Sequence, residues 1–225
     1  MISLGLSLRL FGLEVSALGA AALSLPLRLV VTRERFDPTA PHPTPVVLVH
    51  GFLGDPTNFL LLRSYLAARG VRNFATFSYP PRLDYQRLAV RLGRAIEAVC
   101  LATGAPEVDV IGHSLGGLVA RYLVEMQPES RVRRLVTLGA PYFANRLSPQ
   151  ELAIFAASDP FIVPPHPVYG PHAAHRLTGG VVVVPRCGHW GLLYHPTVLE
   201  ESAGFLRAPV GAAELGAPLA LEAAS

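Results

Sequence analysis

Short apolar runs alternate along this chain with longer segments in which apolar residues recur every three to four positions. Brief runs rich in β-branched residues favour buried strands, whereas the longer spacing is typical of amphipathic helices. Residues that begin or end helices sharpen the limits: Asp84 is a suitable N-cap, and Gly70, Gly104 and Pro128 each follow a helical segment. We expect strands at 46–49, 74–77, 108–111, 133–138, 152–156 and 181–184, and helices at 57–69, 84–103, 115–126 and 196–206.

The order of these elements predicts the fold class. Strands that are apolar throughout and alternate with helices are typical of a parallel sheet that is covered on both faces. The sequence therefore predicts an α/β fold with a mostly parallel central sheet and helices on both faces. In such sheets ligands bind beyond the carboxyl ends of the strands, so the residues directly after each strand are the first candidates for chemistry.

The length of 225 residues allows one domain with a substantial core. We expect that domain at 46–208, preceded by a Pro-rich linker at 37–45 and followed by a disordered tail at 209–225. Residues 1–36 form an apolar N-terminal segment.

Within that segment, residues 10–27 are apolar except for Glu14. Three alternatives fit this stretch: a membrane anchor, a secretory signal peptide, or a helix that lies on a membrane or on the domain surface. We therefore expect a protein that is either secreted or associated with a membrane through this segment.

Charge and cysteine content exclude other classes of function. The formal net charge is +3 and every basic residue is Arg, scattered along the chain without interleaved aromatic residues. This is not the footprint of a nucleic-acid-binding protein. The only cysteines, Cys100 and Cys187, belong to no Cys/His cluster, so we expect no metal site. One disulfide between them is an alternative, but two partly buried thiols are favoured.

The sequence GHSLGG at 112–117 falls between the strand expected at 108–111 and the helix expected at 115–126. A G-x-S-x-G pattern in this context is typical of a nucleophile elbow, in which a serine occupies a sharp turn at the edge of a sheet. The glycines two residues to either side of Ser114 leave room for that turn. We predict Ser114 as a catalytic nucleophile.

A serine hydroxyl needs a base within hydrogen-bond reach and an acid that orients the base. Asp159 is the only aspartate after Ser114, and it follows the strand expected at 152–156. His189 lies between two glycines after the last expected strand. We predict Asp159 as the acid and His189 as the base, with His195 as the alternative base. Five glutamates and three histidines fit these roles less well: Glu125, Glu129, Glu151, Glu200 and Glu201, and His166, His172 and His175.

Attack of a serine on an ester carbonyl creates an oxyanion, which backbone N–H groups can stabilise. The N–H of Leu115, at the positive end of the following helix, is one predicted donor. The N–H of Phe52, in the loop after the first expected strand, is the other. We expect His50 to shape that loop, His113 to pack beneath the elbow, and Asp109 to lie at a strand edge.

Five segments together resemble a known family, the bacterial lipases of the α/β-hydrolase superfamily. The last of them resembles the histidine loop of the small, cap-less Bacillus-type lipases. The resemblance spans residues 44–207 and leaves out the N-terminal segment and the tail. The segments are HGFLG at 50–54, GHSLGG at 112–117, GAP at 139–141, SDPFIV at 158–163 and GHWGLL at 188–193.

The resemblance implies an α/β-hydrolase fold that hydrolyses carboxylic esters, often acylglycerols, without a cofactor. Only residues 142–158 separate the GAP segment from Asp159, which leaves no room for a helical cap or a mobile lid. The chain also has no obvious Ca²⁺ loop of the kind found in some larger lipases. We therefore expect a minimal cap or none.

Our interpretation is a serine hydrolase that cleaves carboxylic esters, including lipid esters, through an acyl-enzyme with the triad Ser114, Asp159 and His189. A thioesterase, an amidase or an acyltransferase with the same triad is the main alternative. A non-catalytic lipid-binding protein with the same fold is a further one. Apolar residues near the predicted loops suggest an acyl pocket: Leu53, Phe143, Phe161, Ile162 and Leu192, with Phe52 and Leu118 nearby.

Overall fold

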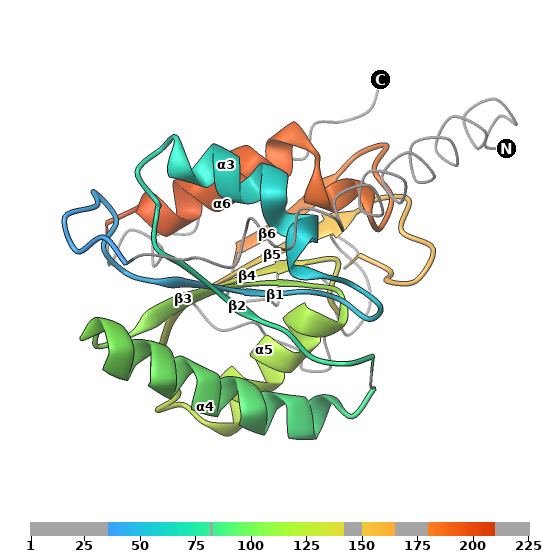
Figure 1. The fold of residues 1–225 in the computed structure, drawn as a ribbon. Coiled ribbons are helices and arrows are strands. Elements are labelled where there is room, and N and C mark those ends of the chain that lie inside the picture. Colours follow the sequence, from blue (N-terminus) through green and yellow to red (C-terminus); the bar gives the residue numbers. More distant parts are fainter. Residues whose placement is uncertain (1–35, 82, 142–149, 165–179, 210–225) are drawn as a thin grey trace, which may run out of the picture.

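In a computed structural model of the chain, which describes residues 36–81, 83–141, 150–164 and 180–209, strands and helices alternate up to residue 138 (Figure 1). The strands are β1 (Val46–Val49), β2 (Phe74–Phe77), β3 (Val108–His113), β4 (Val132–Leu138), β5 (Glu151–Ala156) and β6 (Gly180–Val184). The helices are the 3₁₀ helix η2 (Pro56–Phe59), α3 (Leu60–Ala67), α4 (Tyr85–Thr103), α5 (Leu115–Met126), the 3₁₀ helix η4 (Gly191–Leu193) and α6 (Pro196–Arg207).

The six strands form one sheet in the order β2-β1-β3-β4-β5-β6, and every pair of neighbours is parallel. The chain passes from β1 outward to β2 and then returns to the other side of β1 to form β3. Val49 at the end of β1 therefore has Phe77 on one side and Gly112 on the other. This reversal of strand order creates the crevice at which ligands bind in open α/β sheets.

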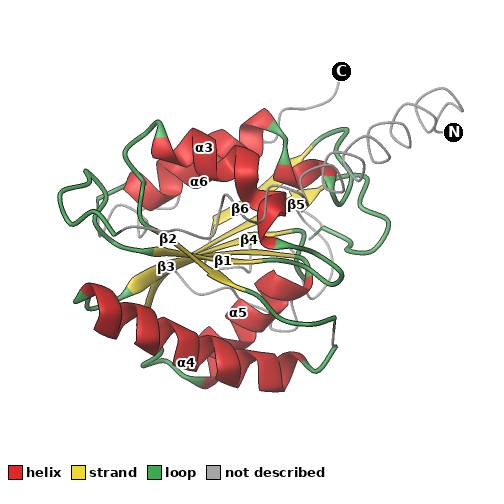
Figure 2. Ribbon diagram, viewed as in Figure 1, coloured by secondary structure: helices red, strands yellow, loops and turns green. Residues whose placement is uncertain are grey.

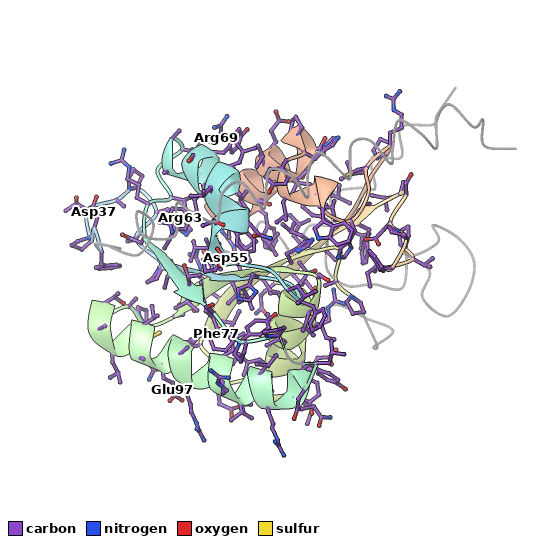
Figure 3. The ribbon with its side chains drawn as sticks, turned by 45° about the vertical axis from the view of Figure 1, so that its right-hand side comes forward. Asp37, Asp55, Arg63, Arg69, Phe77 and Glu97 are labelled. Atoms are coloured by element: carbon purple, nitrogen blue, oxygen red, sulfur yellow. The ribbon has the colours of Figure 1, made fainter. Side chains whose placement is uncertain are left out.

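Helices cover both faces of the sheet, as the apolar strands predict (Figure 2). On one face α3 and α6 pack against residues such as Leu48, Ile111 and Ile154, and on the other α4 and α5 pack against Val47 and Val110. Figure 3 shows Asp55 on the α3 side, where its side chain caps η2, and Phe77 between the sheet and α4. The predicted α/β architecture is confirmed.

The predicted strands and helices are confirmed, with small differences at their ends. The strand expected at 108–111 continues to His113, so the elbow begins directly at the end of β3. The helix expected at 57–69 divides into η2 and α3. The Asp55 carboxylate accepts from the Thr57 N–H at 3.0 Å, and Pro56 fixes the first turn, so this segment starts as a 3₁₀ turn.

The segment expected as a Pro-rich linker is attached to the amino edge of the sheet. Asn73 accepts from the Asp37 N–H at 2.7 Å and donates to the carbonyls of Asp37 and Pro43. His42 Nε2 lies 2.9 Å from the carboxylate of Asp109, which is fully buried and also paired with Arg133. Asp109, predicted at a strand edge, lies near the start of β3 and is a buried ion-pair partner.

Several sequence predictions lie outside the described residues: the apolar stretch at 10–27, the tail from residue 210, and His166, His172 and His175. In the part of the chain that is described, no helix combines the length and apolar character needed to span a bilayer.

Candidate active site

Ser114 occupies a strained turn between β3 and α5. Its backbone has φ 52° and ψ −121°, a conformation that residues other than glycine rarely adopt. Its N–H donates to the Leu138 carbonyl at 2.8 Å, which ties the turn to β4. A Cβ added at Gly112 would lie 2.6 Å from the backbone of Gly117, and one added at Gly116 would overlap the Val49 carbonyl. These contacts explain why the turn requires glycine on both sides of the serine.

Asp159 follows β5 and aims its carboxylate at His189. The Asp159 Oδ2 lies 2.6 Å from His189 Nδ1, and the two side chains are 1% and 5% exposed. The other oxygen, Oδ1, accepts from the N–H groups of Phe161 and Ile162 at 2.8 and 2.9 Å. Since Nδ1 donates to the carboxylate, His189 Nε2 keeps a lone pair that can accept a proton.

His189 lies in the loop that follows β6, and aromatic rings surround it. Phe161 and Trp190 both meet the imidazole edge-on, at ring-centroid distances of 5.2 and 5.4 Å. The same two rings meet each other at 5.4 Å. This packing limits rotation of the imidazole.

Gly139 lies directly against the Asp159–His189 pair. It follows β4 with φ +55°, and an added Cβ would lie 3.2 Å from His189 Nδ1, 3.3 Å from Asp159 Oδ2 and 2.9 Å from Leu192 Cδ1. The sequence identified Gly139 only as part of a resemblance. A glycine directly after a central strand is the signal that could have marked it as a site residue.

His113 links the elbow to the histidine loop. Its Nε2 donates to the His189 carbonyl at 3.2 Å, and the two imidazoles lie 4.9 Å apart. Burial, with a smaller effect of the neighbouring His189, lowers the pKa of His113 to about 3. His113 is therefore neutral at physiological pH and packs beneath the elbow, as the sequence predicts.

The loop after β1 approaches the elbow from the other side. A Cβ added at Gly51 would lie 3.0 Å from the Ser114 Cβ, so backbone and elbow are in direct contact. Leu53 has φ 56°, and the Gly54 N–H donates to the Gly51 carbonyl at 3.0 Å. The predicted oxyanion donors, the N–H groups of Phe52 and Leu115, belong to this loop and to the first residue of α5.

The residues suggested for an acyl pocket fall into different environments. Leu53 and Phe161 are 76% and 61% exposed, and Ile162 packs on Phe155 at the edge of a small apolar cluster. Leu192 is fully buried in the core below the Asp159–His189 pair, so we assign it a packing role. Leu118 is also core, and Phe143 lies outside the described residues.

His195, the alternative base, and Glu151, one of the glutamates that fit the role of acid less well, both have structural roles. His195 is the N-cap of α6 and accepts from the Thr197 N–H at 3.3 Å. Glu151 is buried at the start of β5 and pairs with Arg121, which also contacts Thr137. Among the described residues, no group of three or more His, Cys, Asp or Glu side chains could hold a metal ion.

Taken together, the ends of β1, β3, β5 and β6 bring a strained serine, a carboxylate–imidazole pair and two backbone N–H groups to one edge of the sheet. This arrangement has the parts needed for nucleophilic catalysis by a serine hydroxyl.

The comparisons with known proteins agree with this architecture. A sequence model of the α/β-hydrolase fold matches residues 44–161, which is 118 of the 225 residues. Triacylglycerol lipases of Pseudarthrobacter phenanthrenivorans and Burkholderia plantarii are each 32% identical to the chain in an alignment of length 111 that covers 44% of the chain. These matches cover 33% and 29% of the two lipases, so the aligned region spans about a third of their length.

Among solved structures, Aspergillus fumigatus lipase B has a TM-score of 0.57 at 17% identity, over 75% of this chain and 53% of that one. This likeness concerns the fold. The family match covers more than half of the chain and includes the elbow at Ser114 and the carboxylate at Asp159. The chain therefore belongs to the α/β-hydrolase fold family.

Proposed function

We propose that the protein is a serine hydrolase that cleaves carboxylic esters through an acyl-enzyme. The observation that carries the proposal is the 2.6 Å contact between Asp159 and His189, which adjoins the elbow of Ser114. The names of the two lipase relatives also support an ester substrate.

In the first half-reaction, the Ser114 Oγ attacks the ester carbonyl carbon while His189 Nε2 takes the hydroxyl proton. The carbonyl oxygen becomes an oxyanion, which the N–H groups of Phe52 and Leu115 stabilise. Asp159 stabilises the imidazolium that forms. When the tetrahedral intermediate collapses, the bond to the leaving alkoxide breaks and His189 returns the proton to it, which leaves an acyl group on Ser114.

In the second half-reaction, water takes the place of the alcohol. His189 removes a proton from water as the water oxygen attacks the acyl carbonyl. When the second tetrahedral intermediate collapses, the bond from carbon to the Ser114 Oγ breaks and His189 returns the proton to Oγ, which releases the carboxylic acid and regenerates the serine hydroxyl. The exposed side chains of Leu53 and Phe161, in the loops after β1 and β5, would contact an apolar acyl group. This supports acyl esters over small polar esters as substrates.

The test is hydrolysis of p-nitrophenyl esters from acetate to palmitate by the full chain, beside the Ser114→Ala variant. We expect activity in the wild type and a fall of about 10⁶-fold in kcat in the variant. The preferred chain length separates an esterase from a lipase. A folded wild-type protein that cleaves no ester would contradict the proposal.

A fluorophosphonate probe and a panel of thioesters and amides separate the alternatives. Labelling at Ser114 without ester cleavage would favour a thioesterase, an amidase or an acyltransferase. No labelling at all would favour a lipid-binding protein. Location at a membrane or outside the cell stays a separate proposal, and fractionation of cells that express the full chain tests it.

A further inference from the structure

The loops after β1 and β2 are joined by two stacked rings. Val49 and Phe77 are register partners at the ends of these parallel strands, so the chain beyond them continues side by side. The rings of His50 and Tyr79 stack at a centroid distance of 4.4 Å with 16° between their planes. Both side chains are buried, so this contact belongs to the interior of the site.

Hydrogen bonds fix the orientation of both rings. The Tyr79 hydroxyl donates to the His50 carbonyl at 2.5 Å. Burial raises the pKa of Tyr79 above its usual value, which keeps the hydroxyl protonated as a donor. The Tyr79 N–H donates to His50 Nε2 at 3.4 Å, and the Ser78 hydroxyl lies at the same distance. An amide N–H can only donate, so Nε2 is the acceptor nitrogen of His50.

The other ring nitrogen holds the peptide that carries the predicted oxyanion donor. His50 Nδ1 lies 2.9 Å from the Gly51 carbonyl, and since a carbonyl can only accept, Nδ1 carries the hydrogen. The Gly54 N–H donates to the same oxygen at 3.0 Å. A trans peptide is planar, so two bonds to the Gly51 C=O also fix the direction of the Phe52 N–H, which points the opposite way.

This peptide lies next to the nucleophile. The backbone at Gly51 is in contact with the Ser114 side chain, and a Cβ added at Gly116 would lie 2.5 Å from the His50 carbonyl. The same carbonyl therefore meets the Tyr79 hydroxyl and the first turn of α5. A shift of the His50 ring would move the Phe52 N–H relative to Ser114.

We propose that His50, oriented by Tyr79, is a positioning residue that aims the Phe52 N–H at the oxyanion. This inference rests on the proposed serine-hydrolase function and deepens it, because it assigns a second layer of residues to the oxyanion hole. Neither ring contacts the reacting atoms: they act through the Gly51–Phe52 peptide. Such donors need to be aimed before the reaction, and a displacement of about 1 Å can cost about 10²-fold in rate.

Three variants test the His50–Gly51 and Tyr79–His50 hydrogen bonds one at a time. His50→Phe keeps a stacking ring but loses the donor to Gly51, and we expect kcat to fall about 10²-fold. His50→Asn offers an amide N–H near the position of Nδ1, so it should recover most of that loss. Tyr79→Phe keeps the stack and removes only the hydroxyl, and we expect kcat to fall about 10-fold.

The readouts separate positioning from a loss of folding. KM should change much less than kcat, because the oxyanion forms only in the transition state. The affinity for an alkyl boronic acid, whose adduct with serine places an oxygen in the oxyanion hole, should fall in step with kcat/KM. The matched control is Tyr122→Phe on α5, since Tyr122 packs edge-on against Tyr85 away from the elbow, and this variant should keep wild-type kcat.

The outcomes are distinct. Wild-type kcat in both folded His50→Phe and Tyr79→Phe would overturn this inference and leave the proposed function intact. Equal losses in His50→Phe and His50→Asn would also overturn it, because donation to Gly51 would then not matter. If His50→Phe does not fold, Tyr79→Phe and His50→Asn decide the matter. A wild-type protein that hydrolyses no ester would overturn the proposed function, and this inference with it.

Discussion

Gly139 lies so close to His189 that one added carbon atom would reach the imidazole: the Cβ would be 3.2 Å from Nδ1. It would also lie 3.3 Å from the Asp159 carboxylate, whose bond to the same nitrogen is 2.6 Å long. The residue that follows β4 therefore lies directly against both Asp159 and His189. Any side chain at this position has to displace the pair or the neighbouring Leu192.

We expect Gly139→Ala to lower kcat at least 10-fold, because a displaced His189 no longer meets Ser114 in a productive geometry. The positive φ of +55° should also destabilise the fold by about 1–2 kcal/mol. Steady-state kinetics and thermal unfolding measure the two effects. The matched control is Gly104→Ala, since Gly104 has φ +72° and no atom within 4 Å of an added Cβ. Gly104→Ala should lose stability but keep kcat, and an equal kcat for both variants would contradict the prediction.

Asp159→Asn should lower kcat about 10⁴-fold, because an amide cannot hold His189 in the tautomer that leaves Nε2 unprotonated. Thermal stability should change little, since the shape of the side chain is preserved. Kinetics with a soluble ester at several pH values test this.

Glu151→Gln is the control for Asp159→Asn, since both carboxylates have side chains that are 1% exposed and each is paired with a basic side chain. This change leaves the buried charge of Arg121 without its ion-pair partner, so we expect a loss of about 3 kcal/mol in stability. The kcat of the folded protein should stay near the wild-type value. A greater fall in kcat for Glu151→Gln than for Asp159→Asn would show that the acid was misassigned.

His113 makes stability depend on pH. Burial lowers its pKa in the folded state to about 3 from an ordinary value of 6.5. Between these values the unfolded chain binds a proton that the folded protein does not, so stability falls as pH falls from about 6.5 toward 3. The contribution of this one group is about 1 kcal/mol per pH unit in that window.

His113→Gln should flatten this dependence, because glutamine retains an N–H for the His189 carbonyl but does not titrate. Urea unfolding of both proteins at pH 7, 6, 5 and 4.5 provides the comparison. His195, whose pKa is also lowered by burial, is present in both proteins and cancels in the difference. Parallel stability curves would contradict the assignment of a neutral, buried His113.

Cys100 and Cys187 should remain reduced thiols that react slowly in the folded protein. Both are buried and form no disulfide. Cys100 packs with α4 on one face of the sheet, and Cys187 packs with the core on the opposite face. We expect no reaction with a thiol reagent in native buffer, two reactive thiols in guanidinium chloride, and a Tm that does not depend on reductant. A mass decrease of two hydrogens in the native protein would indicate a disulfide and contradict this.

Local chemistry explains why so much of the fold could be predicted. The limits of β1, β2 and α5 agree with the sequence prediction, because a β-branched run, a helix cap or a proline acts within a few residues of itself. The elbow is local in the same way, since the strained φ of Ser114 depends on glycines two residues away. The order of strands and helices then predicted a parallel sheet.

Contacts between distant segments could not be predicted in this way. The ordered attachment of residues 37–45 depends on Asn73 and Asp109, and a Pro-rich composition indicates only that a segment lacks regular backbone hydrogen bonds. The burial of Leu192 could not be predicted either, because an apolar residue in the loop around His189 looks the same in the sequence whether its side chain faces a substrate or the core.

The sequence by itself determined the class of fold, the elbow at Ser114 and which residues directly follow each strand, because these depend on short-range sterics and hydrophobic periodicity. Only the tertiary structure decided that Asp159 meets His189 at 2.6 Å, that Gly139 lies against both, and that Tyr79 stacks on His50. These contacts join residues from separate strands, and they exist only because parallel pairing brings the carboxyl ends of those strands to one edge of the sheet.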